Sequence, residues 1–119
     1  MIWDGIERRR FVRVKVSFRT DIYDDKEATI STSAEDISEV GIRVAIKEGL
    51  KVSSLVDLEI YLTEAPLICK GKVIWTKKVE AEYLKDKVIF DTGIEFQDLK
   101  EEDRLTIKHL VDSQKQKRE

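Results

Sequence analysis

Residue types that build many functional sites are nearly missing from this chain of 119 residues. It has one cysteine, Cys69, and one histidine, His109. A single cysteine excludes an intramolecular disulfide and a cysteine-based zinc site, and a single histidine excludes histidine dyads and multi-histidine metal sites. One thiol without a bridge fits a reducing compartment, so we expect a cytoplasmic protein without a bound metal.

Long apolar runs and the common catalytic motifs are absent as well. Residues 1–10 contain no apolar stretch resembling a signal peptide, and no segment approaches the roughly 20 apolar residues of a membrane-spanning helix. The sequence has no nucleophile elbow, no Walker-type glycine loop and no metal-ligand spacing. We therefore expect no membrane insertion, no catalytic residues and no enzymatic activity.

Charge is nearly balanced overall but unevenly distributed. The chain has 22 basic and 24 acidic side chains, for a net charge of −2. Residues 1–19 hold six basic and two acidic groups, a local charge of +4, which leaves −6 on the remainder. An acidic body weakens the approach of a long polyanion but leaves a small anionic ligand free to reach the basic segment. We expect no DNA or RNA partner.

Period-two alternation of apolar residues dominates the chain and predicts six strands. They fall near residues 12–22, 28–34, 42–46, 56–62, 68–77 and 88–96. Their connections are too short for crossover helices, so the strands are antiparallel, and internal glycines at Gly71 and Gly93 mark bends or bulges. We expect a small closed barrel, which removes exposed sheet edges.

Only the C-terminal segment has a helical pattern. Asp98 is the expected N-cap, with Glu101 at capping-box spacing, and Ile107, Leu110 and Val111 share one face that could cover an end of the barrel. The fold class is therefore all-β with one C-terminal helix. We expect a flexible basic arm over residues 1–10, the barrel domain with its helix over 11–112, and a frayed tail over 113–119.

Two short motifs carry the chemistry. Residues 8–13 hold four arginines, whose planar guanidinium groups pair bidentately with phosphates or with guanine O6 and N7. Residues 36–41 read Asp-Ile-Ser-Glu-Val-Gly, and the Asp36 carboxylate could accept the two donors on the Watson–Crick edge of guanine. Taken singly, each also fits a structural interpretation. The first could be a solvated basic arm, and the second a turn, with Gly41 allowing close backbone approach or a positive φ.

Together, the two motifs resemble the PilZ domain family of bacterial cyclic di-GMP receptors. The family pattern is R-x-x-x-R followed, one strand hairpin later, by (D/N)-x-S-x-x-G, and residues 9–13 and 36–41 match every specified position. The likeness continues at residues 41–44, 71–75 and 93–96 and covers about residues 6–112. It implies a six-stranded antiparallel PilZ-type β-barrel with a ligand site on its outer surface.

The resemblance also implies roles for individual residues. Arg9 and Arg13 would hold phosphates and guanine edges, Asp36 would accept from a guanine base, and Ser38 and Gly41 would shape the same pocket. The ligand would be cyclic di-GMP, with no cofactor.

Three further positions are candidates for contact with the ligand. An arginine at position 8, before the motif, accompanies binding of an intercalated cyclic di-GMP dimer in this family, and Arg10 is a phosphate candidate. Trp75 shares strand parity with Val73, which favours a core or barrel-end position, whereas in some single-domain members a tryptophan here packs against the ligand.

We therefore expect a non-catalytic receptor. Ligand binding would order the basic arm against residues 36–41 and present a changed surface to an unidentified protein partner in trans. Family association points to motility, pilus assembly, biofilm or exopolysaccharide production. The alternative is a PilZ-like adaptor that binds protein partners without nucleotide. Such members typically lack one of the two motifs, and both are intact here.

Overall fold

The described part of the chain forms six strands followed by one helix. The computed structural model describes residues 12–25, 29–80 and 88–117. Its elements, in chain order, are β1 (Val14–Tyr23), β2 (Thr29–Ile37), β3 (Gly41–Ile46), β4 (Leu55–Ile60), β5 (Leu67–Glu80), β6 (Val88–Phe96) and α2 (Glu101–Lys117). The predicted fold class, all-β with one C-terminal helix, is confirmed.

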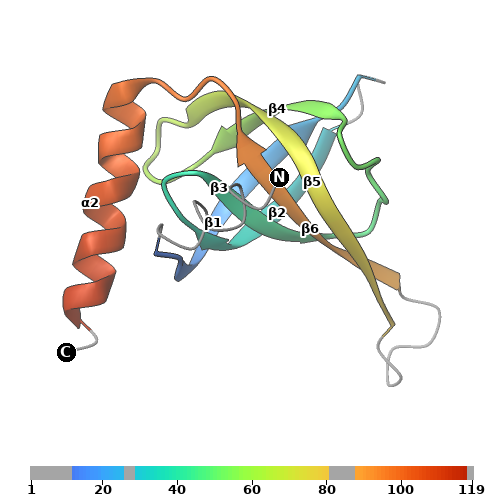
Figure 1. Cartoon of the computed structure of the whole chain (residues 1–119), viewed down its shortest axis with the longest axis horizontal. Helices are drawn as coiled ribbons and strands as arrows, with labels where there is room; N and C mark the ends of the chain where they lie inside the picture. The colour runs from blue at the N-terminus through green and yellow to red at the C-terminus, as the bar shows by residue number, and fades with distance from the viewer. Residues whose placement is uncertain (1–11, 26–28, 81–87, 118–119) are drawn as a thin grey trace, which may run out of the picture.

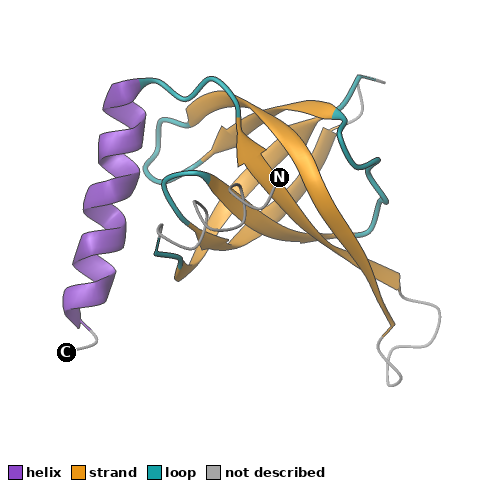
Figure 2. Cartoon of the chain, viewed as in Figure 1, coloured by secondary structure: helices purple, strands orange, loops and turns teal. Residues whose placement is uncertain are grey.

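The strands close into a barrel in the order β1-β2-β3-β6-β5-β4, with every neighbouring pair antiparallel. Figure 1 shows β5 and β6 continuing beyond the barrel as a long two-stranded ribbon, and α2 standing beside the barrel. Figure 2 shows that the helix is separated from β6 by one connecting loop. Because the barrel is closed, each strand pairs with a neighbour on both sides, as expected from the sequence.

The barrel interior is filled by aliphatic side chains from every strand. Alternation places one face of each strand inward, and burial of these side chains from water supplies the main stabilising free energy of a domain of this size. The fully buried large side chains include Ile22, Ile37, Ile42, Leu58, Ile60, Val73, Ile94 and Ile107. Cys69 is buried among them, and burial raises the pKa of its thiol to about 12.

The helix α2 contributes to this core through one face. Of the predicted face, Ile107 and Val111 are buried in the core cluster and Leu110 is partly buried against it, whereas Leu105 is exposed. The predicted N-cap was wrong: α2 begins at Glu101, and the Asp98 carboxylate instead accepts a hydrogen bond from the backbone N–H of Lys70 at 2.7 Å. The helix also continues to Lys117, into the segment we had expected to be a frayed tail. No helix in the described ranges combines the length and the apolar character needed to cross a membrane.

The sequence predicted that residues 36–41 interrupt the strand pattern, but the structure shows a shorter interruption. Strand β2 continues through Asp36 to Ile37, and β3 already begins at Gly41, so only residues 38–40 lie between the strands. The connection is therefore tight. Asp36 consequently lies on a strand, where its direction is set by sheet geometry.

Candidate functional site

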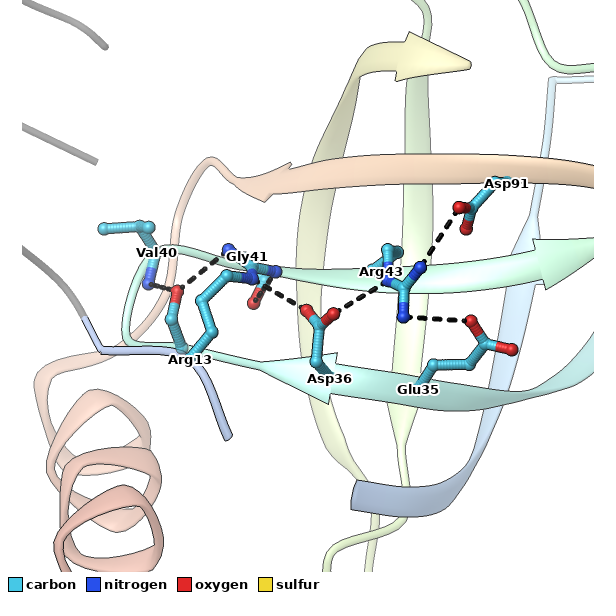
Figure 3. Close-up of polar contacts among 8 residues, drawn as sticks. Arg13, Glu35, Asp36, Val40, Gly41, Arg43 and Asp91 are labelled. Atoms are coloured by element: carbon cyan, nitrogen blue, oxygen red, sulfur yellow. Dashed lines mark hydrogen bonds and ion pairs between the residues drawn. The ribbon is translucent and has the colours of Figure 1, made fainter. Parts of the chain in front are cut away.

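The structure brings the second arginine of the first motif onto the second motif. Arg13 lies just before β1, and its Nε donates to Asp36 Oδ1 at 2.7 Å. Its Nη1 lies 3.3 Å from Ser38 Oγ and its Nη2 lies 3.4 Å from the carbonyl oxygen of Gly41. Residues separated by 23 to 28 positions in the chain thus meet on the outside of the barrel, as Figure 3 shows.

A β-bulge turns Asp36 outward. Ile30 and Ala34 point into the barrel, and an uninterrupted strand would carry Asp36 inward with them. The register between β2 and β3 shifts between Ala34 and Asp36, which places Glu35 as the extra residue. The shift sends Ile37 into the core, fully buried, and leaves the Asp36 side chain 15% exposed on the outer surface.

The three residues between β2 and β3 are fixed by short hydrogen bonds. The backbone N–H of Ser38 donates to the Gly41 carbonyl at 2.9 Å, and the Val40 N–H donates to Ser38 Oγ at 3.2 Å. A Cβ on Gly41 would lie 2.3 Å from the carbonyl oxygen of Ile94, so close backbone approach requires glycine there. Its φ is not positive. Ser38 is fully buried, and its hydroxyl therefore shapes this turn.

A second bulge turns Trp75 outward as well. The register between β5 and β6 shifts between Val73 and Trp75, so these residues do not share a face although they are two apart. Val73 is fully buried, whereas Trp75 is 39% exposed. The core position that parity favoured for Trp75 was therefore wrong. Its indole lies over Gly93, where a Cβ would come within 2.2 Å of the indole Nε1.

These side chains surround a surface cavity of about 250 Å³. Its lining comes from the segment before β1 and from β2, β3, β5 and β6: Arg13, Asp36, Val40, Gly41, Ile42, Arg43, Ile74, Trp75, Gly93, Ile94 and Glu95. This volume lies just below the usual range for small-molecule pockets, roughly 300–1,000 Å³. The cavity therefore has room for part of a larger molecule, such as one base.

Arg43 is a major part of this site that sequence reasoning missed. Its Nε donates to Asp36 Oδ2 at 2.8 Å, its Nη1 to Asp91 Oδ2 at 3.1 Å, and its Nη2 lies 3.4 Å from Glu35 Oε2. Burial acts to lower the pKa of Arg43, but the hydrogen bond to Asp36 and the neighbouring carboxylates outweigh it and raise the pKa. Only the strand register, in which Arg43 lies opposite Asp36, could have indicated this role.

The loop after β2 is also tied to the helix. Arg104 Nη1 donates to Glu39 Oε1 at 2.6 Å, and the same guanidinium pairs with Glu101 one turn earlier in α2. The Glu39 side chain is 18% exposed, so this ion pair is partly shielded from water. The segment that carries Ser38 and the start of α2 are thus joined directly.

The remaining predicted ligand residues, Arg8, Arg9 and Arg10, lie outside the described residues. Within the described ranges, no group of three or more histidine, cysteine or acidic side chains is arranged to hold a metal ion. The site shown by the described residues is therefore an arginine–carboxylate cluster beside an exposed indole.

Comparisons with known proteins agree with the barrel and its helix. The family model of the PilZ domain matches residues 7–113 of this chain. The PilZ domain of YcgR from Escherichia coli, solved with c-di-GMP, is similar with a TM-score of 0.72 and 12% identity, over 92% of this chain and 93% of that chain. A search of curated proteins gives no match.

Two longer proteins contain a similar barrel. MotI/DgrA, an inhibitor of motility from Bacillus subtilis, has a TM-score of 0.70 and 19% identity, over 93% of this chain and 51% of that one. MrkH from K. pneumonia has a TM-score of 0.76 and 13% identity, over 90% and 48%. This chain thus spans about half the length of both, and at such identities the likeness shows the fold alone. The match of the PilZ model to nearly the whole sequence shows that the chain belongs to the PilZ domain family.

Proposed function

We propose that this chain is a non-catalytic receptor for cyclic di-GMP. The observation that carries the proposal is the meeting of Arg13, Asp36 and Trp75 around one cavity on the outer barrel surface. These residues supply a phosphate-binding cation, an acceptor for guanine donors and a stacking surface. The solved PilZ domain of YcgR, which has the same fold, was obtained with c-di-GMP.

Binding requires an exchange of partners at Asp36. In the structure Arg13 Nε donates to Asp36 Oδ1. A guanine base that donates from N1 and N2 would replace Arg13 on this carboxylate and release its guanidinium for a phosphate or for guanine O6 and N7. The Asp36 carboxylate already accepts from Arg13, so the base must supply equivalent hydrogen bonds to displace this arginine.

Arg8, Arg9 and Arg10 complete the proposed site. They supply the positive charge that two linked phosphates require, since the described lining contains two arginines and two acidic side chains. With Arg8 before the motif, we propose that two intercalated ligands bind per chain. Ordering of residues 1–10 over the ligand would then change the surface offered to a protein partner in trans.

Calorimetric titration of the full chain tests this function. We expect micromolar or tighter binding of cyclic di-GMP, with cyclic di-AMP and GMP as controls that bind much more weakly. A ratio near two ligands per chain should fall to one in Arg8→Ala and stay near two in Lys15→Ala, which removes an exposed charge from β1. Absence of heat with cyclic di-GMP would overturn the proposal and favour a protein-binding adaptor.

A further inference from the structure

The ion pairs at the cavity form a line across neighbouring strands. Asp91 on β6 pairs with Arg43 on β3 at 3.1 Å, Arg43 pairs with Asp36 on β2 at 2.8 Å, and Asp36 pairs with Arg13 before β1 at 2.7 Å. Figure 3 shows the four side chains following one another with alternating charge. Asp36 is therefore held by two guanidinium groups, one on each carboxylate oxygen.

The two guanidinium groups are anchored very differently. Arg13 is 42% exposed, and beyond Asp36 its partners among the described residues are uncharged oxygens at 3.3 and 3.4 Å. Arg43 is 33% exposed and is bound by three carboxylates, those of Asp36, Asp91 and Glu35. Among the described contacts, displacing Arg13 breaks fewer charge-assisted bonds than displacing Arg43, so a ligand can displace Arg13 at lower cost.

Asp91 anchors Arg43 from outside the set of residues that line the cavity. Its Oδ2 accepts from Arg43, while its Oδ1 is buried and has no hydrogen-bond partner among the described residues. A buried carboxylate oxygen without a partner is unfavourable. The pairing with Arg43 is thus the interaction that offsets the placement of Asp91 here.

We propose that Arg43 and Asp91 are positioning residues for Asp36. This inference rests on the proposed function, in which Asp36 receives a guanine base. Arg43 holds Oδ2 and so keeps Oδ1 aimed at the place that Arg13 vacates when it moves to the ligand. Asp91 holds Arg43 back, because an unanchored guanidinium could turn toward the ligand phosphates and release the carboxylate.

Titrations of the full-length variants Asp91→Asn and Arg43→Lys test the role. Each should bind cyclic di-GMP about 5-fold more weakly, the size of effect expected for residues coupled to a site. The double variant should be no weaker than Arg43→Lys alone, because Asp91 acts only through Arg43. Asp57→Asn on β4, where Asp57 lies opposite Lys70, is the matched control and should bind as the wild type does.

Selectivity separates positioning from simple destabilisation. Cyclic di-IMP lacks the guanine 2-amino group, so a well-aimed carboxylate favours cyclic di-GMP over it. The ratio of the two affinities should fall in Asp91→Asn and Arg43→Lys. Unchanged affinity and ratio in both variants would overturn the inference, and so would equal weakening toward both ligands, which indicates loss of fold.

A readout on the ligand-free protein keeps the two proposals distinguishable. If the wild type does not bind cyclic di-GMP, the proposed function fails, and the positioning of Asp36 is judged from the Arg13 Nε–H, which donates to it. Its exchange with water, measured by NMR, should be faster in Asp91→Asn and Arg43→Lys than in Asp57→Asn. Equal exchange rates in all three would overturn the positioning role.

Discussion

Among the described residues, two aspartate–arginine clusters lie on the outer surface of the barrel. The Asp36 cluster consists of Arg13, Asp36, Arg43, Glu35 and Asp91. The Asp21 cluster consists of Arg19, Asp21, Ser31 and Tyr61. In the Asp21 cluster, Arg19 and Ser31 both donate to Asp21, and the Arg19 guanidinium lies 5.0 Å from the centre of the Tyr61 ring.

The two clusters differ in the regularity of the sheet beneath them. Asp21 lies opposite Ser31 in an uninterrupted ladder and is 4% exposed, covered by its own neighbours. Asp36 lies next to register shifts toward both β1 and β3, and it lines a cavity. The same pair of residue types is thus a structural contact on a regular ladder, and a candidate binding site where bulges leave room beside it.

Gly41→Ala should produce the largest loss of stability, because it adds a methyl group where two backbone segments lie closest together beside the Asp36 cluster. Its Cβ would meet the Ile94 carbonyl at 2.3 Å, and a backbone oxygen cannot move aside cheaply. We expect the free energy of unfolding, measured with urea, to fall by about 3 kcal/mol. In Gly71→Ala the three atoms nearest to the new Cβ belong to the side chains of Ile94 and Leu58, which can shift more easily than backbone, so the loss should be smaller. Equal losses would contradict this difference.

Arg13→Ala and Arg19→Ala remove the same charge from the two clusters. In Arg13→Ala, cyclic di-GMP affinity should fall roughly 30-fold, which corresponds to about 2 kcal/mol for a charge-assisted contact. Arg19→Ala should leave the affinity within twofold of the wild type, because Arg19 pairs with Asp21 away from the cavity. Calorimetry measures both. A similar loss in the two variants would indicate general attraction by positive charge instead of a defined site.

Trp75→Ala and Tyr61→Ala compare the two aromatic side chains. Trp75 lines the cavity at 39% exposure, so its removal should weaken ligand binding about tenfold through lost stacking, with little change in stability. Tyr61 lies against Arg19, and its removal should not change affinity. If ligand quenches tryptophan fluorescence equally in wild type and Trp75→Ala, the proposed stacking is wrong.

The smallest expected effect is on the stability of the protein at alkaline pH. It arises at Tyr23, which lies beside the Asp21 cluster. The hydrogen bond from Tyr23 to Glu59, with burial and the charge of Glu59, raises the pKa of Tyr23 above its ordinary value of about 10. The unfolded chain therefore loses this proton first, and stability present below pH of about 10 is lost as pH rises through the raised folded pKa. Urea unfolding between pH 9 and 11 should show a shallower decline in Tyr23→Phe. Identical declines in wild type and Tyr23→Phe would contradict the contribution of Tyr23. The substitution should leave cyclic di-GMP affinity unchanged.

The sequence predicted the six strands and the closing helix because their signals are local. Alternation over a few residues identifies each strand, and spacing identifies the helical face of Ile107 and Val111. Motif resemblance indicated Arg13 and Asp36 as one site. Gly93 was expected at a bend, but the bulge that reorients Trp75 follows from pairing between strands, which the parity of one strand does not contain.

Local alternation and spacing could not predict the ion pairs between residues that lie far apart in the chain. Arg43 and Asp91 are 48 residues apart, and Glu39 and Arg104 are 65 apart. In a chain with 22 basic and 24 acidic side chains, very many such pairings are possible. Only the closed strand order, which places β3 beside β6, selects the pair at Arg43.

The bulge at Ile74 has a consequence for alignment and redesign of this barrel. If Ile74 instead took a regular ladder position opposite Gly93, Trp75 would share the face of Val73 and its indole would turn into the barrel. A substitution such as Ile74→Val keeps the spacing and hence the direction of Trp75. At this position the pairing register matters more than the identity of residue 74, so a sheet in which the same residues paired without a bulge would lose the outward indole that lines the cavity.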